Sequence, residues 1–180
     1  MRGIRSLLLL AVLASGCGGG DKASAPLPPA PDEIRLTSPA FGAGSTIPRR
    51  FTCDGDEVSP PLRWAGVPAD ARELALVMED RDAPDGTFVH WTVLGMRPTT
   101  KGLSEGRVPR GTLQTENSFG DRRYGGPCPP EGDKPHRYVF SLYALSKRLA
   151  LAASASPDEV RSALRRAATA RGRLTATYGR

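Results

Sequence analysis

The two histidines of this chain, His90 and His136, each begin an apolar run and each follow a polar motif that contains proline. The segment Asp80-Arg81-Asp82-Ala83-Pro84 precedes the first histidine, and Gly126-Pro127-Cys128-Pro129-Pro130 precedes the second. Proline ends a strand or stiffens a loop, so both motifs are expected at strand ends, where binding groups are often placed. If the two segments meet in space, they form a small concave site around two imidazoles.

Two further side chains complete this candidate site. Asp82 supplies a carboxylate and Tyr138 a phenol. The ring N–H groups, the Tyr138 hydroxyl and main-chain N–H groups of the Gly-rich loop can donate to phosphate oxygens, while Asp82 orients a histidine. This set of groups is better suited to holding an anion than to breaking a bond.

Three other interpretations of the histidines remain open. Both can be structural residues, partly buried and hydrogen-bonded to Asp80 or Asp82. Imidazole and carboxylate also bind zinc, but the chain has no His-x-x-x-His or Cys-x-x-Cys spacing. A hydrolase would need an activated nucleophile, and Ser59, within Ser59-Pro60-Pro61, lies in no Gly-x-Ser-x-Gly elbow. We therefore predict binding without a metal, a cofactor or turnover.

Residues 1–17 have the pattern of an export signal. Two arginines give a positive start, and the apolar run at 7–13 is shorter than the roughly 20 residues of a membrane-spanning helix. The small residues before Cys17 resemble the lipobox of bacterial lipoproteins, although Ala14 replaces the usual leucine. An ordinary cleavable signal is the alternative. We predict lipidation of Cys17 and tethering to a cell-envelope membrane, facing the periplasm or the exterior.

The next segment, residues 18–31, is rich first in glycine and then in alanine and proline. This composition predicts a flexible linker between the anchor and a domain, or, without lipid, a disordered N-terminus. Residues 32–180 have the length of one domain, and no repeat or second linker interrupts them.

The formal net charge is +6, and Arg2 and Arg5 of the signal contribute two of these charges. The remaining basic residues are mostly arginines scattered along the chain rather than clustered with aromatic residues. No helical recognition motif accompanies them. We therefore expect no nucleic-acid partner.

The chain contains 3 cysteines. If Cys17 carries lipid, Cys53 and Cys128 remain as a pair in an oxidising compartment. A bridge between them would close a long loop and stabilise the fold by about 4 kcal/mol in the chain-entropy model. Two free thiols are the alternative, and the sequence leaves both open.

Strand-like segments dominate the predicted domain. Apolar, β-branched and aromatic residues gather at 73–78, 87–94 and 136–145, with shorter candidates at 34–37 and 174–178. The segments between them are thick with Gly, Pro, Asp and Asn, which indicates long loops.

A single strong helix signal lies near the end of the chain. Ser156 can cap the helix, Pro157 suits its first position, and Glu159 stands three residues after the cap. The apolar stripe predicts a helix to about Ala170. Many strands with one late helix predict a mostly-β domain, a sandwich or a barrel.

Strand periodicity predicts which site residues share a face. Alternate side chains point the same way, so His136 and Tyr138 are expected on one face. By the same rule, His90 shares its face with Phe88 and Thr92.

Several short motifs occur in a fixed order along the domain. They are Asp-x-Asp-Ala-Pro at 80–84, His90-Trp91, Gly-Pro-x-Pro-Pro-x-Gly-x-x-x-His-Arg-Tyr at 126–138, Cys53-Asp54-Gly55 and Ser59-Pro60-Pro61-Leu62-x-Trp64. Together they resemble the phosphatidylethanolamine-binding protein family, also called Raf kinase inhibitor-like proteins, and its bacterial branch most closely. The similarity covers nearly all of residues 34–180.

This resemblance implies a β-sandwich-like domain with a small anion pocket. The family's pocket residues fall on Asp82, His90, His136 and Tyr138, and Pro127 and nearby loop residues form walls. Members of the family bind phosphate-type anions and phospholipid head groups, and some inhibit kinases or have been linked to protease inhibition. The last predicted strand ends at Tyr178, without the C-terminal helix that animal members carry near the pocket.

Two hypotheses of function follow. The first is a non-catalytic, membrane-tethered protein that binds a phosphate-type anion or a phospholipid head group. The alternative is an inhibitor that binds a protein partner through the same loops. A phosphoester hydrolase is a weaker third option.

Overall fold

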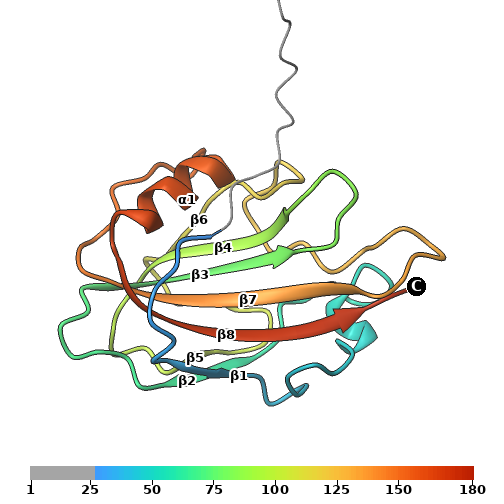
Figure 1. Ribbon diagram of the computed structural model, residues 1–180, viewed down its shortest axis with the longest axis horizontal. Coiled ribbons are helices and arrows are strands. Elements are labelled where there is room, and N and C mark those ends of the chain that lie inside the picture. Colours follow the sequence, from blue (N-terminus) through green and yellow to red (C-terminus); the bar gives the residue numbers. More distant parts are fainter. Residues whose placement is uncertain (1–26) are drawn as a thin grey trace, which may run out of the picture.

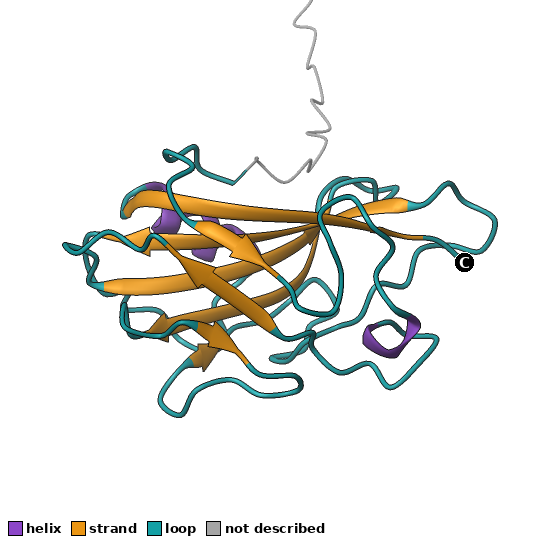
Figure 2. Ribbon diagram, turned by 90° about the horizontal axis from the view of Figure 1, so that it is seen from below, coloured by secondary structure: helices purple, strands orange, loops and turns teal. Residues whose placement is uncertain are grey.

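The computed structural model describes residues 27–180. Figure 1 shows a larger sheet with a helix on one side and a smaller sheet on the other, and Figure 2 shows the loops that gather at one end of the strands. The predicted signal peptide, the lipidation site at Cys17 and most of the predicted linker lie outside the described residues. The mostly-β class predicted from the sequence is confirmed, and the arrangement is a sandwich rather than a closed barrel.

The larger sheet is antiparallel, with the strand order β6-β4-β3-β7-β8. Its strands are β3 (Glu73–Asp80), β4 (Phe88–Met96), β6 (Leu113–Gln114), β7 (His136–Leu145) and β8 (Ala168–Tyr178). The predicted bounds of β7 are those observed. Strand β3 continues two residues beyond the predicted end because Glu79 and Asp80 still pair with both neighbouring strands.

The smaller sheet has the order β1-β2-β5. It is formed by β1 (Arg35–Thr37), β2 (Leu62–Ala65) and β5 (Gly102–Leu103), and a short 3-10 helix, η1 (Arg49–Phe51), lies in the loop between β1 and β2. Strands β2, β5 and β6 were not predicted, because segments of two to four residues carry too little periodic pattern.

The core between the two sheets contains every second residue of the central strand. Leu74, Leu76 and Met78 of β3 belong to it, whereas Ala75 and Val77 point to the opposite face and pack towards the helix. This alternation places the next residues predictably: Asp80 follows the inter-sheet face, and Glu79 follows the helix face, where Arg161 binds it at 3.2 Å.

The helix α1 (Pro157–Arg165) begins as the sequence predicts. Ser156 accepts from the Glu159 main-chain N–H, and the Glu159 carboxylate binds the Ser156 main chain in return, which forms a capping box. The predicted end at Ala170 is wrong: the helix ends at Arg165, and the chain enters β8 at Ala168. Pairing of β8 with β7 along its whole length outweighs the local helical pattern.

The start of the packed domain lies earlier than the predicted boundary at residue 32. Leu27 is buried against the helix-side core, and the Pro31 carbonyl accepts from the Arg171 main-chain N–H at 2.8 Å. The last residues of the predicted linker therefore belong to the domain. Within the described part of the chain, no helix has the length and apolar character needed to cross a membrane.

Candidate functional site

Strand order brings the predicted site residues together at one end of the larger sheet. Strand β3 lies between β4 and β7, and its last residue, Asp80, stands opposite both Phe88 and Tyr138. The beginning of β4 and the beginning of β7 therefore meet at the end of β3. This arrangement places His90, His136 and Tyr138 around Asp80.

His90 occupies an irregular position in β4. Trp91 pairs with Met78 and Val89 pairs with Glu79, so His90 is the extra residue of a β-bulge. Trp91 consequently belongs to the inter-sheet core while Val89 faces the helix. The bulge turns the His90 ring towards Tyr138, with ring centroids 5.3 Å apart.

The prediction that His90 shares a face with Thr92 is therefore wrong. Trp91 and Val93 both face the inter-sheet core, so Thr92 between them points to the opposite side of the sheet. Phe88 does lie beside His90, with ring centroids 5.2 Å apart. Alternation does not predict the faces of this strand because the bulge inserts one extra residue, His90, into β4.

The His90 ring is buried and has a defined tautomer. Its Nδ1 lies 3.0 Å from the Gly125 carbonyl oxygen, which can only accept, so Nδ1 carries the proton. Burial lowers the pKa of His90, although the Gly125 carbonyl and the charge of Asp80 act in the opposite direction. In the neutral ring Nε2 is an acceptor, and it becomes a donor only when the ring takes up a proton.

His136 lies between two carboxylates. Its Nδ1 is 2.8 Å from Oδ2 of Asp80, and its Nε2 is 3.6 Å from Oδ2 of Asp133. Asp80 is buried, whereas Asp133 is half exposed on the loop before β7. Asp80 thus orients the His136 ring, and the second nitrogen faces the loop side of the site.

Asp82 does not have the predicted contact with a histidine. Its carboxylate accepts from the main-chain N–H and from the guanidinium of Arg137, on the outer side of β7. The hydrogen bond from Arg137 holds the pKa of Asp82 below its usual value. The orienting role predicted for Asp82 belongs to Asp80, because the strand continues to Asp80 and the chain turns away before Asp82.

Tyr138 lies at the bottom of the site and is fully buried. Its hydroxyl oxygen has no partner in hydrogen-bond geometry among the described residues. Burial and the charge of Asp80 raise the pKa of Tyr138, so the phenol remains protonated at neutral pH. A buried donor without a partner is costly in a folded protein, and the groups that act on this hydroxyl are the Asp80 carboxylate and the Cys128 main chain.

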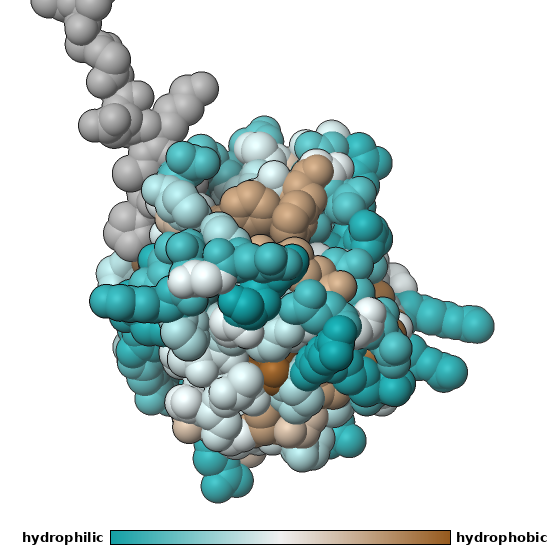
Figure 3. Space-filling model, turned by 90° about the vertical axis from the view of Figure 1, so that its right-hand side faces the viewer, coloured by the Kyte–Doolittle hydropathy of each residue, from teal (hydrophilic) through white to brown (hydrophobic). Residues whose placement is uncertain are grey.

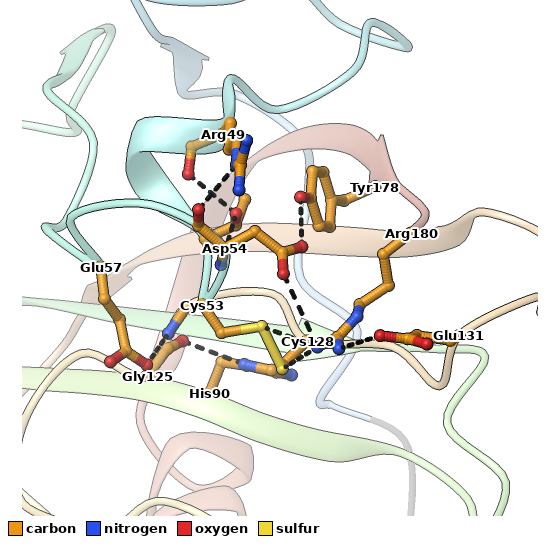
Figure 4. Close-up of a disulfide and its surroundings, with 12 residues drawn as sticks. Arg49, Cys53, Asp54, Glu57, His90, Gly125, Cys128, Glu131, Tyr178 and Arg180 are labelled. Carbon is orange, nitrogen blue, oxygen red and sulfur yellow. Dashed lines mark hydrogen bonds and ion pairs between the residues drawn. A yellow bond between two sulfur atoms is a disulfide. The ribbon is translucent and has the colours of Figure 1, made fainter.

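The Pro-rich loop closes one side of the site. Pro127 is buried, and its carbonyl accepts from the Cys53 main-chain N–H at 3.1 Å. Figure 4 shows Cys53 and Cys128 joined as a disulfide, with their Cα atoms 5.5 Å apart. Of the two alternatives from the sequence, the structure has the bridge. The loop is thereby attached to the segment that follows η1.

The guanidinium of Arg180 lies against this disulfide. Its Nη1 is 3.0 Å from the Cys128 sulfur, and its Nη2 forms an ion pair with Glu131 at 2.9 Å. In Figure 4 the same view places His90 and Gly125 beside the bridge, so the disulfide supports the wall of the site. Within residues 27–180, no three His, Cys, Asp or Glu side chains converge as a metal ion would require.

Two aromatic residues cover the remaining side. Phe119 is half exposed, and its ring packs edge-on against Phe88 at 4.6 Å and against His90 at 5.4 Å between centroids. A Cβ at Gly125 would lie 2.6 Å from Phe119, so this position accepts glycine alone while the ring stays in place. Figure 3 views this end of the molecule and shows hydrophobic surface among hydrophilic residues.

Sequence reasoning missed several residues that shape the site. They are Asn117, Phe119, Gly125 and Asp133. Asp80 was expected only as a possible hydrogen-bond partner of a structural histidine, not as a residue of the binding site. Asn117 organises the loop by accepting from two main-chain N–H groups and donating to the His90 and Arg123 carbonyls. Its position in a polar stretch was the available signal, because asparagine commonly stabilises such turns.

Comparisons with known proteins agree with this architecture. The family model described as phosphatidylethanolamine-binding protein matches residues 37–179. A Mycobacterium tuberculosis protein named "Putative lipoprotein LppC" is 39% identical over 186 residues, covering 95% of this chain and 92% of the relative. A UPF0098 protein of Methanothermobacter thermautotrophicus is 41% identical over 152 residues, covering 82% of this chain and 99% of its own.

A solved structure has the same fold. The crystal structure of Escherichia coli YbcL, described as a new member of the mammalian PEBP family, superposes with a TM-score of 0.79. The two chains are 31% identical, and the match covers 82% of this chain and 99% of YbcL.

Proposed function

The chain belongs to the phosphatidylethanolamine-binding protein family, and from this premise we propose that it is an exported, lipid-anchored protein that binds a phosphate-type anion without turnover. The ligand is a free phosphate compound or the head group of a phospholipid. The binding site is the one formed by Asp80, His90, His136 and Tyr138, with Pro127 in its wall.

The observation that carries this proposal is the buried Tyr138 hydroxyl, which has no partner in hydrogen-bond geometry among the described residues. It lies beside the His90 ring and close to Asp80, whose charge acts on it. A phosphate oxygen accepts from this phenol, and the protonated His90 ring donates a second, charge-assisted hydrogen bond. Pairing of the His136 ring with Asp80 keeps that ring in position for a third.

This mode of binding depends on pH. Burial favours neutral His90, whereas a bound anion favours its protonated form. The affinity for phosphate therefore rises as the pH falls through and below about 6.5, the ordinary histidine pKa. Turnover is not expected, because the cysteine beside the site is held in a disulfide and supplies no thiolate.

Attachment to a membrane through Cys17 is part of the proposal. The lipobox-like sequence, the name of the mycobacterial relative and a disulfide suited to an oxidising compartment support it. The domain then faces the periplasm or the exterior.

Binding can be tested by thermal unfolding of the purified full chain in detergent. We expect inorganic phosphate and phosphoethanolamine to raise the melting temperature, more at pH 6 than at pH 8, because only the folded state binds. If phosphoethanolamine acts at a much lower concentration than phosphate, the source is a lipid head group. Similar effects of the two indicate a free phosphate compound.

The site is tested by a pair of variants in one loop. His136→Ala should abolish most of the ligand-induced shift, while Lys134→Ala, which removes an exposed neighbouring charge, should keep most of it. An unchanged shift in His136→Ala would count against this site.

A further inference from the structure

A hollow lies at the opposite end of β3 from Asp80. Its volume is about 600 Å³, and the beginning of β3, the end of β4 and the loop before β6 line it. A register shift between Leu74 and Leu76 of β3 lies next to it, and Gly95 of β4, with φ +76°, stands at its wall. The hollow is separated from the histidine site by the length of a strand of eight residues.

Four arginines surround this hollow: Arg72, Arg97, Arg110 and Arg148. All four are exposed, and none of them forms an ion pair with a carboxylate in the described part of the chain. Most other arginines of the domain are paired, as Arg137 is with Asp82. Several unpaired guanidinium groups around one concavity focus a positive potential in it.

One carboxylate lies within this positive surround. Glu73 lines the hollow and is 4% exposed. Its Oε2 accepts from the Leu149 main-chain N–H at 3.3 Å, but its Oε1 is buried and has no partner in hydrogen-bond geometry among residues 27–180. The nearby Gly95 main-chain N–H still acts on this carboxylate and lowers its pKa, against the larger effect of burial. Burial raises the pKa of Glu73, so its charge opposes the arginines less than an exposed carboxylate would.

The unpartnered oxygen and the arginines require different groups from a ligand. Guanidinium groups bind phosphate oxygens through paired hydrogen bonds. The Glu73 Oε1 atom needs an O–H or N–H donor. A phosphate ester meets the first requirement through its oxygens, and a separate hydroxyl group of the same molecule meets the second without taking a phosphate oxygen away from the arginines.

We propose that this hollow binds a small phosphorylated sugar or polyol, whose phosphate lies among the arginines while one of its hydroxyl groups donates to Glu73. The site is independent of the histidine site. Gly111 leaves room for the sugar, because even a Cβ added at this residue would meet no atom within 4 Å.

The proposal is tested by an NMR titration of the full chain in detergent micelles, with glucose 6-phosphate as the probe. We expect saturable shifts of the Gly95, Gly111 and Thr112 amides, which border the hollow. Inorganic phosphate should bind more weakly, and glucose more weakly still. Equal affinity for phosphate and glucose 6-phosphate would contradict the role of Glu73, and shifts confined to Gly125 and Gly126 would overturn the site.

Two double variants that remove equal charge distinguish binding in the hollow from a general effect of positive charge. The double variant Arg97→Ala/Arg110→Ala should weaken binding of glucose 6-phosphate about tenfold or more, since each substitution removes charge-assisted hydrogen bonds. Arg35→Ala with Arg166→Ala removes the same charge from exposed positions outside the hollow and should change the affinity less than about twofold. An equal loss in both pairs would overturn the proposal. His136→Ala should leave this binding intact, so the two sites succeed or fail separately.

Discussion

Asp80 and Asp82 are identical in chemistry and two residues apart, yet they have different partners. Asp80 ends β3 on the inter-sheet face and binds the His136 ring, whereas Asp82 lies beyond the strand and binds Arg137. Main-chain geometry accounts for the difference: Asp82 donates its N–H to Asp80, which turns the chain outward. The role of a carboxylate here depends on where pairing of the strand stops.

The buried His90 ring makes stability depend on pH. Its folded pKa lies below the ordinary value near 6.5, so the unfolded chain takes up the proton first as the pH falls. This contribution to the free energy of unfolding is fully present above about pH 6.5 and is lost as the pH falls towards the folded pKa. Urea unfolding of the full chain between about pH 8 and pH 5 measures it.

A variant isolates this contribution from the other titrating groups. His90→Gln cannot take up the proton, so its stability should fall less than that of the native chain over the same range. The comparison concerns the slope with pH, because the substitution also changes packing against Tyr138 and Phe119. Parallel pH profiles of the two proteins would refute the assignment.

Local features of the strands set the direction of the side chains that form the site. The bulge in β4 turns His90 to the same side of the sheet as Trp91. In β3, alternation of side chains places Asp80 on the face of the site and Glu79 on the face of the helix. Burial raises the pKa of Glu79, although Arg81 and Arg161 oppose this. Neighbouring residues of β3 therefore serve different layers: Asp80 contacts the site, and Glu79 contacts the helix.

The disulfide joins two loop elements whose cysteines are 75 residues apart in sequence. In the chain-entropy model a loop of this length corresponds to about 4 kcal/mol of stabilisation. We expect Cys53→Ser with Cys128→Ser to lower the free energy of unfolding by about that amount in denaturant titrations. The same variant should bind phosphate more weakly, because the loop with Gly125 and Pro127 loses an attachment.

Reductant provides the control for this experiment. It should destabilise the native chain and leave the double serine variant unchanged, since the described region contains no other bridge. A native chain whose unfolding midpoint does not move after verified reduction would show that the bridge adds little.

At the scale of the whole molecule, the two proposed sites lie at opposite ends of one sheet, and the described chain begins at Leu27 beside the helix-side core. The anchor predicted at Cys17 is close in sequence to this start. A short tether would hold the domain near a membrane surface that carries phosphate head groups.

Anchoring is tested by fractionation of cells that express the full chain. The native chain should partition with membranes, and Cys17→Ser should move to the soluble fraction. Mass spectrometry of the N-terminal peptide should find lipid on Cys17. A native N-terminus that begins elsewhere without lipid would contradict the anchor but not the binding site.

Local sequence determined some of the elements of this protein. The alternation in 136–145 specifies β7, and the capping box at Ser156 specifies the start of α1, because both signals act through neighbours in the chain. The ordered His, Asp and Pro motifs also identified the family and the two segments, around His90 and around His136, that contribute to the site.

Tertiary structure alone decided the contacts. Asp80 meets His136 across 56 residues, and Gly125 meets His90 across 35. The β4 bulge, the early end of α1 and the arginine-rimmed hollow likewise depend on how the strands pair. Such contacts depend on register, and a shift of one residue reverses every side chain, so no local pattern encodes them.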